Sequence, residues 1–172
     1  ATQNRTPQLR RLITSIEKMV TQAFVGLIVV DQASTDENTR QVVGSSSLVH
    51  KKYLFAPRNA FQFSRSILLN HGIQSIDSND VLFTADVDVS LPANLYAIVL
   101  SSVRQGQQIY APIITVEKKR KKRMGFGIAG GAGTETVPTL LPWGFGIFGA
   151  YASDYIKVQG YDTNTFKYGW GG

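Results

Sequence analysis

Apolar residues recur along the chain with two different periods, and their alternation predicts the fold class. Residues 7–23 carry apolar side chains three or four positions apart, which is the spacing of a helix with one buried face. Residues 24–31, FVGLIVVD, form a continuous run rich in β-branched residues, which is typical of a strand buried on both faces. Further strands are expected at HKKYLFAP (50–57), VLFTA (81–85) and QIYAPIITV (108–116).

Segments with helical character separate these strands. Ser34 or Thr35 is expected to cap a helix whose first turn contains Asp36 and Glu37, because acidic side chains favour the amino end of a helix. Further helices are expected at residues 63–76, 92–103 and 153–158. This alternation indicates an α/β protein with a mostly parallel sheet and flanking helices. No internal repeat or domain break is visible, so a single domain spanning residues 1–172 is expected.

Charge and composition narrow the possible functions. The chain has a formal net charge of +6 and no cysteine, so neither a disulfide nor a thiolate metal site is expected. The six consecutive basic residues Lys118 to Arg123 account for this charge, which argues against a nucleic-acid-binding surface. This run opens the glycine-containing segment 117–142, expected to be a long loop. The run could bind a polyanion, or it could be a solvated, mobile stretch, which is the commoner case. No membrane segment or signal peptide is expected.

Carboxylates stand where two of the predicted strands end. Asp31 follows LIVV, and Asp86 and Asp88 follow VLFTA. Ligands of open α/β sheets bind outside the carboxyl ends of strands, so these acids are expected to line one crevice. Their oxygens suit Mn²⁺ or Mg²⁺ shared with a phosphate. The alternative is a solvated strand end for Asp86 and Asp88 and an Asx-type turn for Asp31.

Four motifs in order give the chain a family resemblance. VVDQASTD at 29–36, FSRSILLNHG at 63–72, DVD at 86–88 and GWGG at 169–172 resemble the inverting glycosyltransferases of GT-A fold, specifically the β-1,4-galactosyltransferase and chondroitin N-acetylgalactosaminyltransferase group. The resemblance implies a GT-A (Rossmann-like) domain that uses a UDP-sugar donor, a glycan acceptor and usually Mn²⁺. DVD alone is a weak signal, whereas the ordered set is specific.

The resemblance also implies roles for particular residues. Asp88 would ligate the metal directly, with Asp86 near the ribose or the metal's water shell and Val87 beside the nucleotide. Donor-nucleotide contacts would come from Asn4, Arg5, Asp31, Phe63 and Arg65. Apart from the resemblance, Arg58 would be a useful counter-charge near a diphosphate, or it could be an ordinary surface charge. Trp170, Gly171 and Gly172 would form a wall against the donor sugar and acceptor. Asp86 and Asp88 are expected to serve the site and not the stability of the fold.

The family pattern extends past both ends of these 172 residues. The family has a strand before its N-R segment and, after GWGG, an acidic pair that includes the catalytic base and later a histidine metal ligand. The chain is therefore expected to be a truncated GT-A domain whose base lies beyond Gly172. A non-catalytic nucleotide-sugar-binding relic, or a fragment of a larger polysaccharide synthase, is the alternative; a nucleotidyltransferase fits GWGG poorly. The compartment stays open: cytoplasm for a bacterial protein, Golgi lumen for a eukaryotic one.

Overall fold

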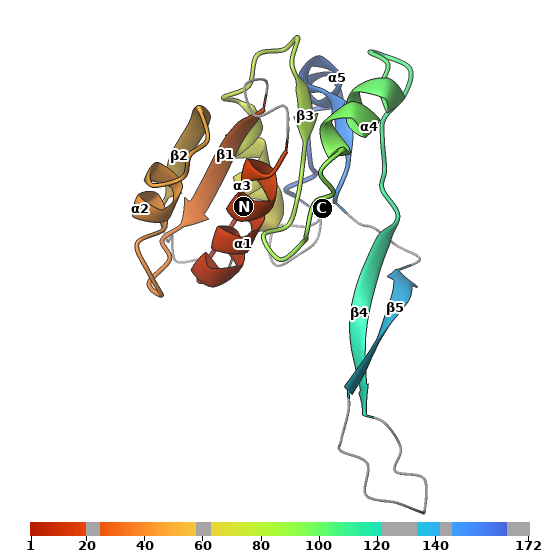
Figure 1. The fold of residues 1–172 in the computed structure, drawn as a ribbon. Coiled ribbons are helices and arrows are strands. Elements are labelled where there is room, and N and C mark those ends of the chain that lie inside the picture. Colours follow the sequence, from red (N-terminus) through yellow and green to blue (C-terminus); the bar gives the residue numbers. More distant parts are fainter. Residues whose placement is uncertain (20–24, 58–62, 122–133, 142–145, 165–172) are drawn as a thin grey trace, which may run out of the picture. The chain divides into compact units, whose positions relative to one another are not determined.

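The computed structural model describes residues 1–19, 25–57, 63–121, 134–141 and 146–164. The chain divides into two compact units, one formed by residues 1–110 with 146–172 and the other by residues 111–145. The first unit is mixed α/β and holds the described helices (Figure 1). No helix within the described ranges combines the length and apolar character that crossing a membrane requires.

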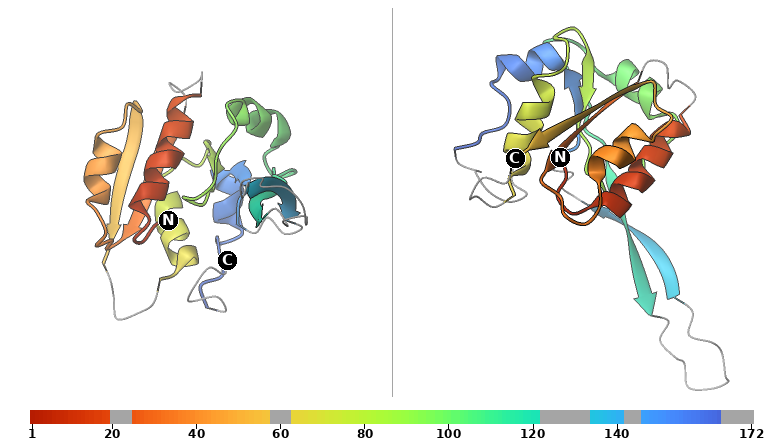
Figure 2. Two further views of the ribbon diagram at one scale, coloured as in Figure 1. Left: turned by 60° about the horizontal axis from the view of Figure 1, so that its bottom comes forward. Right: turned by 90° about the vertical axis from the view of Figure 1, so that its left-hand side faces the viewer.

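A βαβ arrangement forms one half of the first unit. Strand β1 (Gly26–Gln32) pairs in parallel with β2 (His50–Ala56), from Gly26 opposite His50 to Gln32 opposite Ala56. Helix α2 (Thr39–Gly44) lies between them in the chain. The views of Figures 1 and 2 place α1 (Thr6–Glu17) and α2 on one face of these strands and α3 (Arg65–Ile73) on the other.

Alternate residues of β1 explain this layering. Val29 packs with Leu9 and Ile13 of α1 and with Val42 and Val43 of α2, so that one face of the strand is covered. Each such buried apolar side chain stabilises the fold by about 1.5–3 kcal/mol relative to an exposed one.

Helix α3 covers the opposite face of β1. A Cβ atom on Gly72 would lie 3.0 Å from the Val30 side chain. The glycine therefore allows α3 to approach the strand closely, and β1 is buried between two helical layers as its apolar run predicts.

The other half of the first unit pairs its strands antiparallel. Strand β3 (Val81–Phe83) faces β6 (Gly149–Tyr151), with Leu82 opposite Ala150. Helices α4 (Leu95–Ser102) and α5 (Ala152–Lys157) complete this part. Buried Leu82, Ala152 and Tyr155 form a core cluster with Ile73 of α3, which joins the two halves.

The described residues of the second unit form two paired strands where a loop was expected, and the rest of the expected loop lies outside the described residues. Strands β4 (Ile114–Lys121) and β5 (Thr134–Leu141) pair antiparallel, from Ile114 opposite Leu141 to Lys121 opposite Thr134. The prediction of a loop over 117–142 is thus wrong for the paired residues, because a cross-strand ladder outweighs the loop-like composition. The strand expected at 108–116 begins late, and Tyr110 instead forms an isolated bridge with Gly149.

Two further expectations differ from the structure. Of the described strand pairs only β1–β2 is parallel, so the mostly parallel sheet is not what these residues form. Asn38 caps α2, accepting a hydrogen bond from Gln41 N–H, in place of Ser34 or Thr35. Ser34, Thr35 and Asp36 instead form hydrogen bonds with the amino-terminal segment.

Candidate functional site

Asp31 lies buried at the carboxyl end of β1, where the sequence placed it. It is 3% exposed, and its Oδ2 accepts a hydrogen bond from the Tyr53 hydroxyl at 3.0 Å. Its Oδ1 accepts from the hydroxyl of Ser34 at 2.5 Å, across a turn in which Ala33 has a φ of +47°. Burial, and then the Asp31 carboxylate, raise the pKa of Tyr53 to about 12. Asp31 is thus held in one orientation by two hydroxyl groups.

The amino-terminal segment is clasped onto the turn that follows β1. Asn4 donates its backbone N–H to Ser34 Oγ at 2.8 Å, and its side-chain oxygen accepts from Thr35 N at 2.7 Å. Asn4 has a φ of +50°, a region that asparagine tolerates better than most residues. Thr6 donates both its N–H and its hydroxyl to Asp36 at 3.0 Å.

The same segment also runs beside the end of β1. Thr2 donates its N–H to Val30 O and accepts from Gln32 N, both at 2.9 Å. The N-R segment and the STD segment, both predicted to be part of the donor site, are therefore joined by backbone and side-chain contacts. This clasp explains why Ser34, Thr35 and Asp36 do not cap α2.

An ion pair between buried Arg65 and partly exposed Asp86 connects α3 to the DVD motif. Arg65, the first residue of α3, is 4% exposed. Its Nε donates to Asp86 Oδ1 at 2.8 Å, and its Nη2 donates to the carbonyl oxygen of Gly146 at 2.7 Å. The Asp86 side chain is 32% exposed, so the carboxylate reaches the surface while the guanidinium behind it does not. Contact between Arg65 and uridine stays a prediction; the contacts present make it a support for Asp86.

Gly146 leaves no room for any other residue beside Arg65. A Cβ at this position would lie 2.2 Å from Arg65 Nη1, and the backbone has a φ of +80°. The Gly146 carbonyl also accepts from the Thr84 hydroxyl at 2.7 Å. The backbone at Gly146 is therefore fixed to α3 and to the residue that follows β3.

Asp88 differs from Asp86 in its surroundings. It is exposed and makes no hydrogen bond or ion pair with the part of the chain that the structure describes. Val87 between them is 9% exposed and packs into the apolar cluster of α1, β1 and α2. The residue predicted to lie beside the nucleotide thus anchors the loop in the core, and its nucleotide contact stays a prediction. The anchor orients the two carboxylates differently, one inward to Arg65 and one outward to solvent.

Val87, which lies between Asp86 and Asp88, packs in the same apolar cluster as Val29 of β1. The loop that follows β3 therefore lies against the layer formed by α1, β1 and α2. That the acids of the two strand ends line one crevice stays a prediction.

A metal here would need ligands in addition to the side chains that the structure describes. Within the described ranges, no group of three or more His, Cys, Asp and Glu side chains could hold an ion. The donors present are the Asp88 carboxylate and the free oxygen of Asp86. Mg²⁺ and similar hard ions commonly bind through one or two carboxylates, completed by phosphate oxygens and water. The residues therefore fit an ion that arrives with a diphosphate and do not form a closed site of their own.

The remaining predicted residues are only partly described. Arg5 is exposed at the start of α1, and Phe63 is partly buried just before α3. Arg58, Trp170, Gly171 and Gly172 lie outside the described residues. Sequence reasoning did not single out Tyr53, Asn70, Gly146 or Tyr161. A signal existed for Asn70, because it stands in the same F-x-R-x-x-x-L-N-x-G motif as Arg65.

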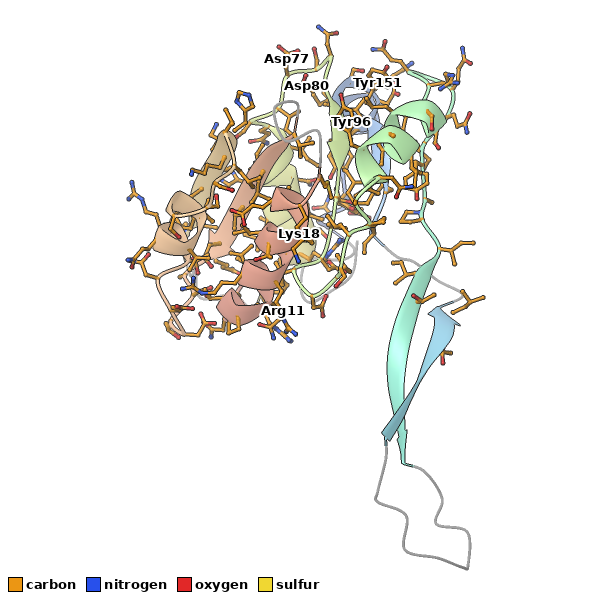
Figure 3. All side chains as sticks on the ribbon, viewed as in Figure 1. Arg11, Lys18, Asp77, Asp80, Tyr96 and Tyr151 are labelled. Atoms are coloured by element: carbon orange, nitrogen blue, oxygen red, sulfur yellow. The ribbon has the colours of Figure 1, made fainter. Side chains whose placement is uncertain are left out.

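Two other charged features are formed by different residues. A groove of about 500 Å³ runs along α1 and is lined by basic side chains, including Arg11 and Lys18 (Figure 3). Asp77 and Asp80 stand beside the start of β3, opposite in the strand to the end that leads to Asp86 (Figure 3). Neither feature contains a residue of the candidate site.

The chain was compared with known proteins. It is 25% identical over 170 residues to the mouse N-acetyl-beta-glucosaminyl-glycoprotein 4-beta-N-acetylgalactosaminyltransferase 1. The similarity covers 93% of this chain but 14% of the mouse protein, so the chain spans about a seventh of that relative's length. No family model and no solved structure matches the chain. The similarity supports a distant relationship to a glycosyltransferase, without defining its type.

Proposed function

We propose that this chain forms the donor-binding part of a metal-dependent glycosyltransferase. It would bind a UDP-sugar and present the sugar to a hydroxyl group of a glycan acceptor, with inversion at the anomeric carbon. The observation that carries the proposal is the contrast within DVD: Asp86 is held by buried Arg65, whereas Asp88 points to solvent without a partner among the described residues. The similarity to the mouse N-acetylgalactosaminyltransferase supports the same class of reaction.

The contrast assigns different tasks to the two carboxylates. Asp88 would hold Mn²⁺ or Mg²⁺ together with the donor diphosphate, because hard cations prefer anionic oxygen. The ion would stabilise the negative charge that develops on the departing UDP. Asp86, fixed by Arg65, would accept from a ribose hydroxyl or from water around the ion. Asp31 would accept from the uracil or ribose, its carboxylate being oriented by Tyr53 and Ser34.

Binding calorimetry with UDP tests the proposal. We expect UDP to bind in the presence of Mn²⁺ and to bind much more weakly when a chelator replaces the ion. CMP is a suitable control, because it offers a pyrimidine and a ribose but a single phosphate. Equal UDP affinity with Mn²⁺ and with chelator would overturn the metal role. In a version of the domain extended past Gly172, where the catalytic base is expected, binding of a UDP-sugar without release of UDP in the presence of glycan acceptors would favour the non-catalytic alternative.

A further inference from the structure

The side-chain amide of Asn70 holds the backbone of one distant residue from both sides. Asn70 Nδ2 donates to the carbonyl oxygen of Tyr161 at 3.0 Å, and Asn70 Oδ1 accepts from the N–H of Tyr161 at 3.0 Å. An amide that binds both polar groups of one residue imitates a neighbouring strand. Asn70 lies in α3, five residues after Arg65, so α3 carries both this clamp and the guanidinium that holds Asp86.

A buried phenol completes the clamp. The Tyr155 hydroxyl donates to Asn70 Oδ1 and lies 3.1 Å from the N–H of Tyr161. Burial raises the pKa of Tyr155, so the hydroxyl stays protonated and remains a donor. Gly160 has a φ of +72°, and a Cβ on it would lie 2.6 Å from Asn70 Oδ1. The backbone of residues 160–161 thus fits closely against Asn70.

Tyr161 in turn contacts the groups that position Arg65. Its ring centroid lies 5.9 Å from Arg65 Cζ, which is within cation–π range. Its hydroxyl donates to the Gly146 carbonyl oxygen at 3.4 Å, the oxygen that also accepts from Arg65 Nη2. Asn70, Tyr161, Arg65 and Asp86 therefore form a continuous series of contacts, which we term the Asn70 relay.

We propose that Asn70 is a positioning residue for the nucleotide site: through Tyr161 and Arg65 it fixes the Asp86 carboxylate. The effect on nucleotide binding rests on the function proposed above, whereas the coupling between Asn70 and Arg65 does not. Arg65 is buried and is bonded on two sides, so its guanidinium can hold Asp86 in one place only while Tyr161 and Gly146 stay in position. Asn70 keeps Tyr161 in position.

A purely structural role for Asn70 makes a different prediction. In that case Asn70 would only satisfy the two backbone groups of Tyr161, and its loss would lower the melting temperature without changing the site of the folded protein. Ile73→Val supplies the matched control, because Ile73 lies in the same helix, is 5% exposed and packs in the Tyr155 cluster. It makes no side-chain hydrogen bond, so it destabilises the fold while leaving the relay bonded.

The test compares Asn70→Ala, Ile73→Val and the parent in the full chain, well below each melting temperature. The first measurement is hydrogen exchange of the Arg65 Nε–H, observed by NMR on isotope-labelled protein. We expect the parent signal to be protected, Asn70→Ala to lose that protection and Ile73→Val to keep it. The second measurement is UDP affinity in the presence of Mn²⁺. It should fall about tenfold or more in Asn70→Ala alone, which is the usual effect of losing a residue that orients a metal-binding side chain.

Tyr161→Leu provides a second variant should Asn70→Ala not fold. It keeps the backbone groups that Asn70 binds and removes the ring beside Arg65, so Arg65 protection should again be lost. The relay is overturned if the Arg65 Nε–H of Asn70→Ala or of Tyr161→Leu stays as protected from hydrogen exchange as in the parent. It is also overturned if Ile73→Val loses this protection to the same extent as Asn70→Ala. If the parent itself does not bind UDP, the proposed function fails, and the exchange measurement still decides whether the relay exists.

Discussion

Replacing Arg65 by methionine removes the guanidinium and keeps a side chain of similar length in the same buried place. Two hydrogen bonds are lost, from Nε to Asp86 at 2.8 Å and from Nη2 to the Gly146 carbonyl at 2.7 Å. Breaking a buried ion pair costs about 3–5 kcal/mol when the remaining charge stays buried. Asp86 is 32% exposed and can be partly hydrated, and Gly146 keeps its bond from Thr84. We therefore expect a loss of about 2–3 kcal/mol in the free energy of unfolding.

Replacing the other member of the ion pair, Asp86, should lower the free energy of unfolding more than Arg65→Met does. Asp86→Asn leaves the cation of Arg65, whose side chain is 5% exposed, without its carboxylate, so the full cost of about 3–5 kcal/mol is expected. Asp88→Asn is the control, because Asp88 is exposed and has no partner in the part of the chain described; its cost should stay within about 0.5 kcal/mol. That Asp88 serves only the site stays a prediction, whereas the ion pair of Asp86 with Arg65 predicts that Asp86 also contributes to stability.

Urea unfolding of the parent, Arg65→Met, Asp86→Asn and the double variant forms a mutant cycle. The coupling between Arg65 and Asp86 should be about 1–3 kcal/mol. In thermal melts Arg65→Met should lower Tm by roughly 5–10 °C. A coupling of zero within error, or Asp86→Asn as stable as Asp88→Asn, would refute the reasoning.

Two further predictions concern close packing and pH. Gly146→Ala should lower the free energy of unfolding by at least about 1–3 kcal/mol, because Gly146 has a φ of +80° and an added Cβ would collide with Arg65. Gly44→Ala is the control: no atom lies within 4 Å of the added Cβ, so this variant should be neutral or slightly stabilised in the same denaturant assay. Equal effects of the two substitutions would contradict this prediction. Because the pKa of Tyr53 is raised to about 12, the phenol's hydrogen bond to Asp31 contributes stability that is fully present below pH 10 and is lost as the pH rises through 12. Tyr53→Phe should therefore be less stable than the parent at neutral pH and approach it in alkaline melts; a constant difference up to pH 12 would count against the assignment.

The sequence predicted elements best where local pattern and burial agree. The part GLIVVD of the apolar run forms β1 because both faces of the strand are covered by helices. The predicted cap of α2, Ser34 or Thr35, was wrong because both residues bind Asn4, which lies 30 and 31 residues away in the chain, so that Asn38 takes the role. The antiparallel pairing of β3 with β6 was also missed. A strand of three residues is too short for its sequence to indicate its pairing partner, which comes nearly 70 residues later in the chain.

In the candidate site, too, the positions set by local sequence were predicted and the contacts between distant residues were not. Strand ends gave the positions of Asp31, Asp86 and Asp88, since a polar residue that follows a buried strand is visible in the pattern. The surroundings of Arg65 were not predictable, because they come from Gly146 and Tyr161, about 80 and 100 residues later in the chain. Neither residue has a composition signal that marks it as a partner of an arginine.

The central claim is that Asp88 binds a metal together with the donor diphosphate, and UDP titration of Asp88→Asn tests it most directly. Calorimetry with Mn²⁺ and with chelator should show that the variant retains the weak, metal-independent affinity of the parent and loses the Mn²⁺-dependent gain. Asp86→Asn, measured while folded, should instead lose about 10–100-fold of affinity, the size typical of residues that act behind a ligand. Full Mn²⁺-dependent UDP binding by a folded Asp88→Asn would contradict the account and return DVD to a strand-end turn.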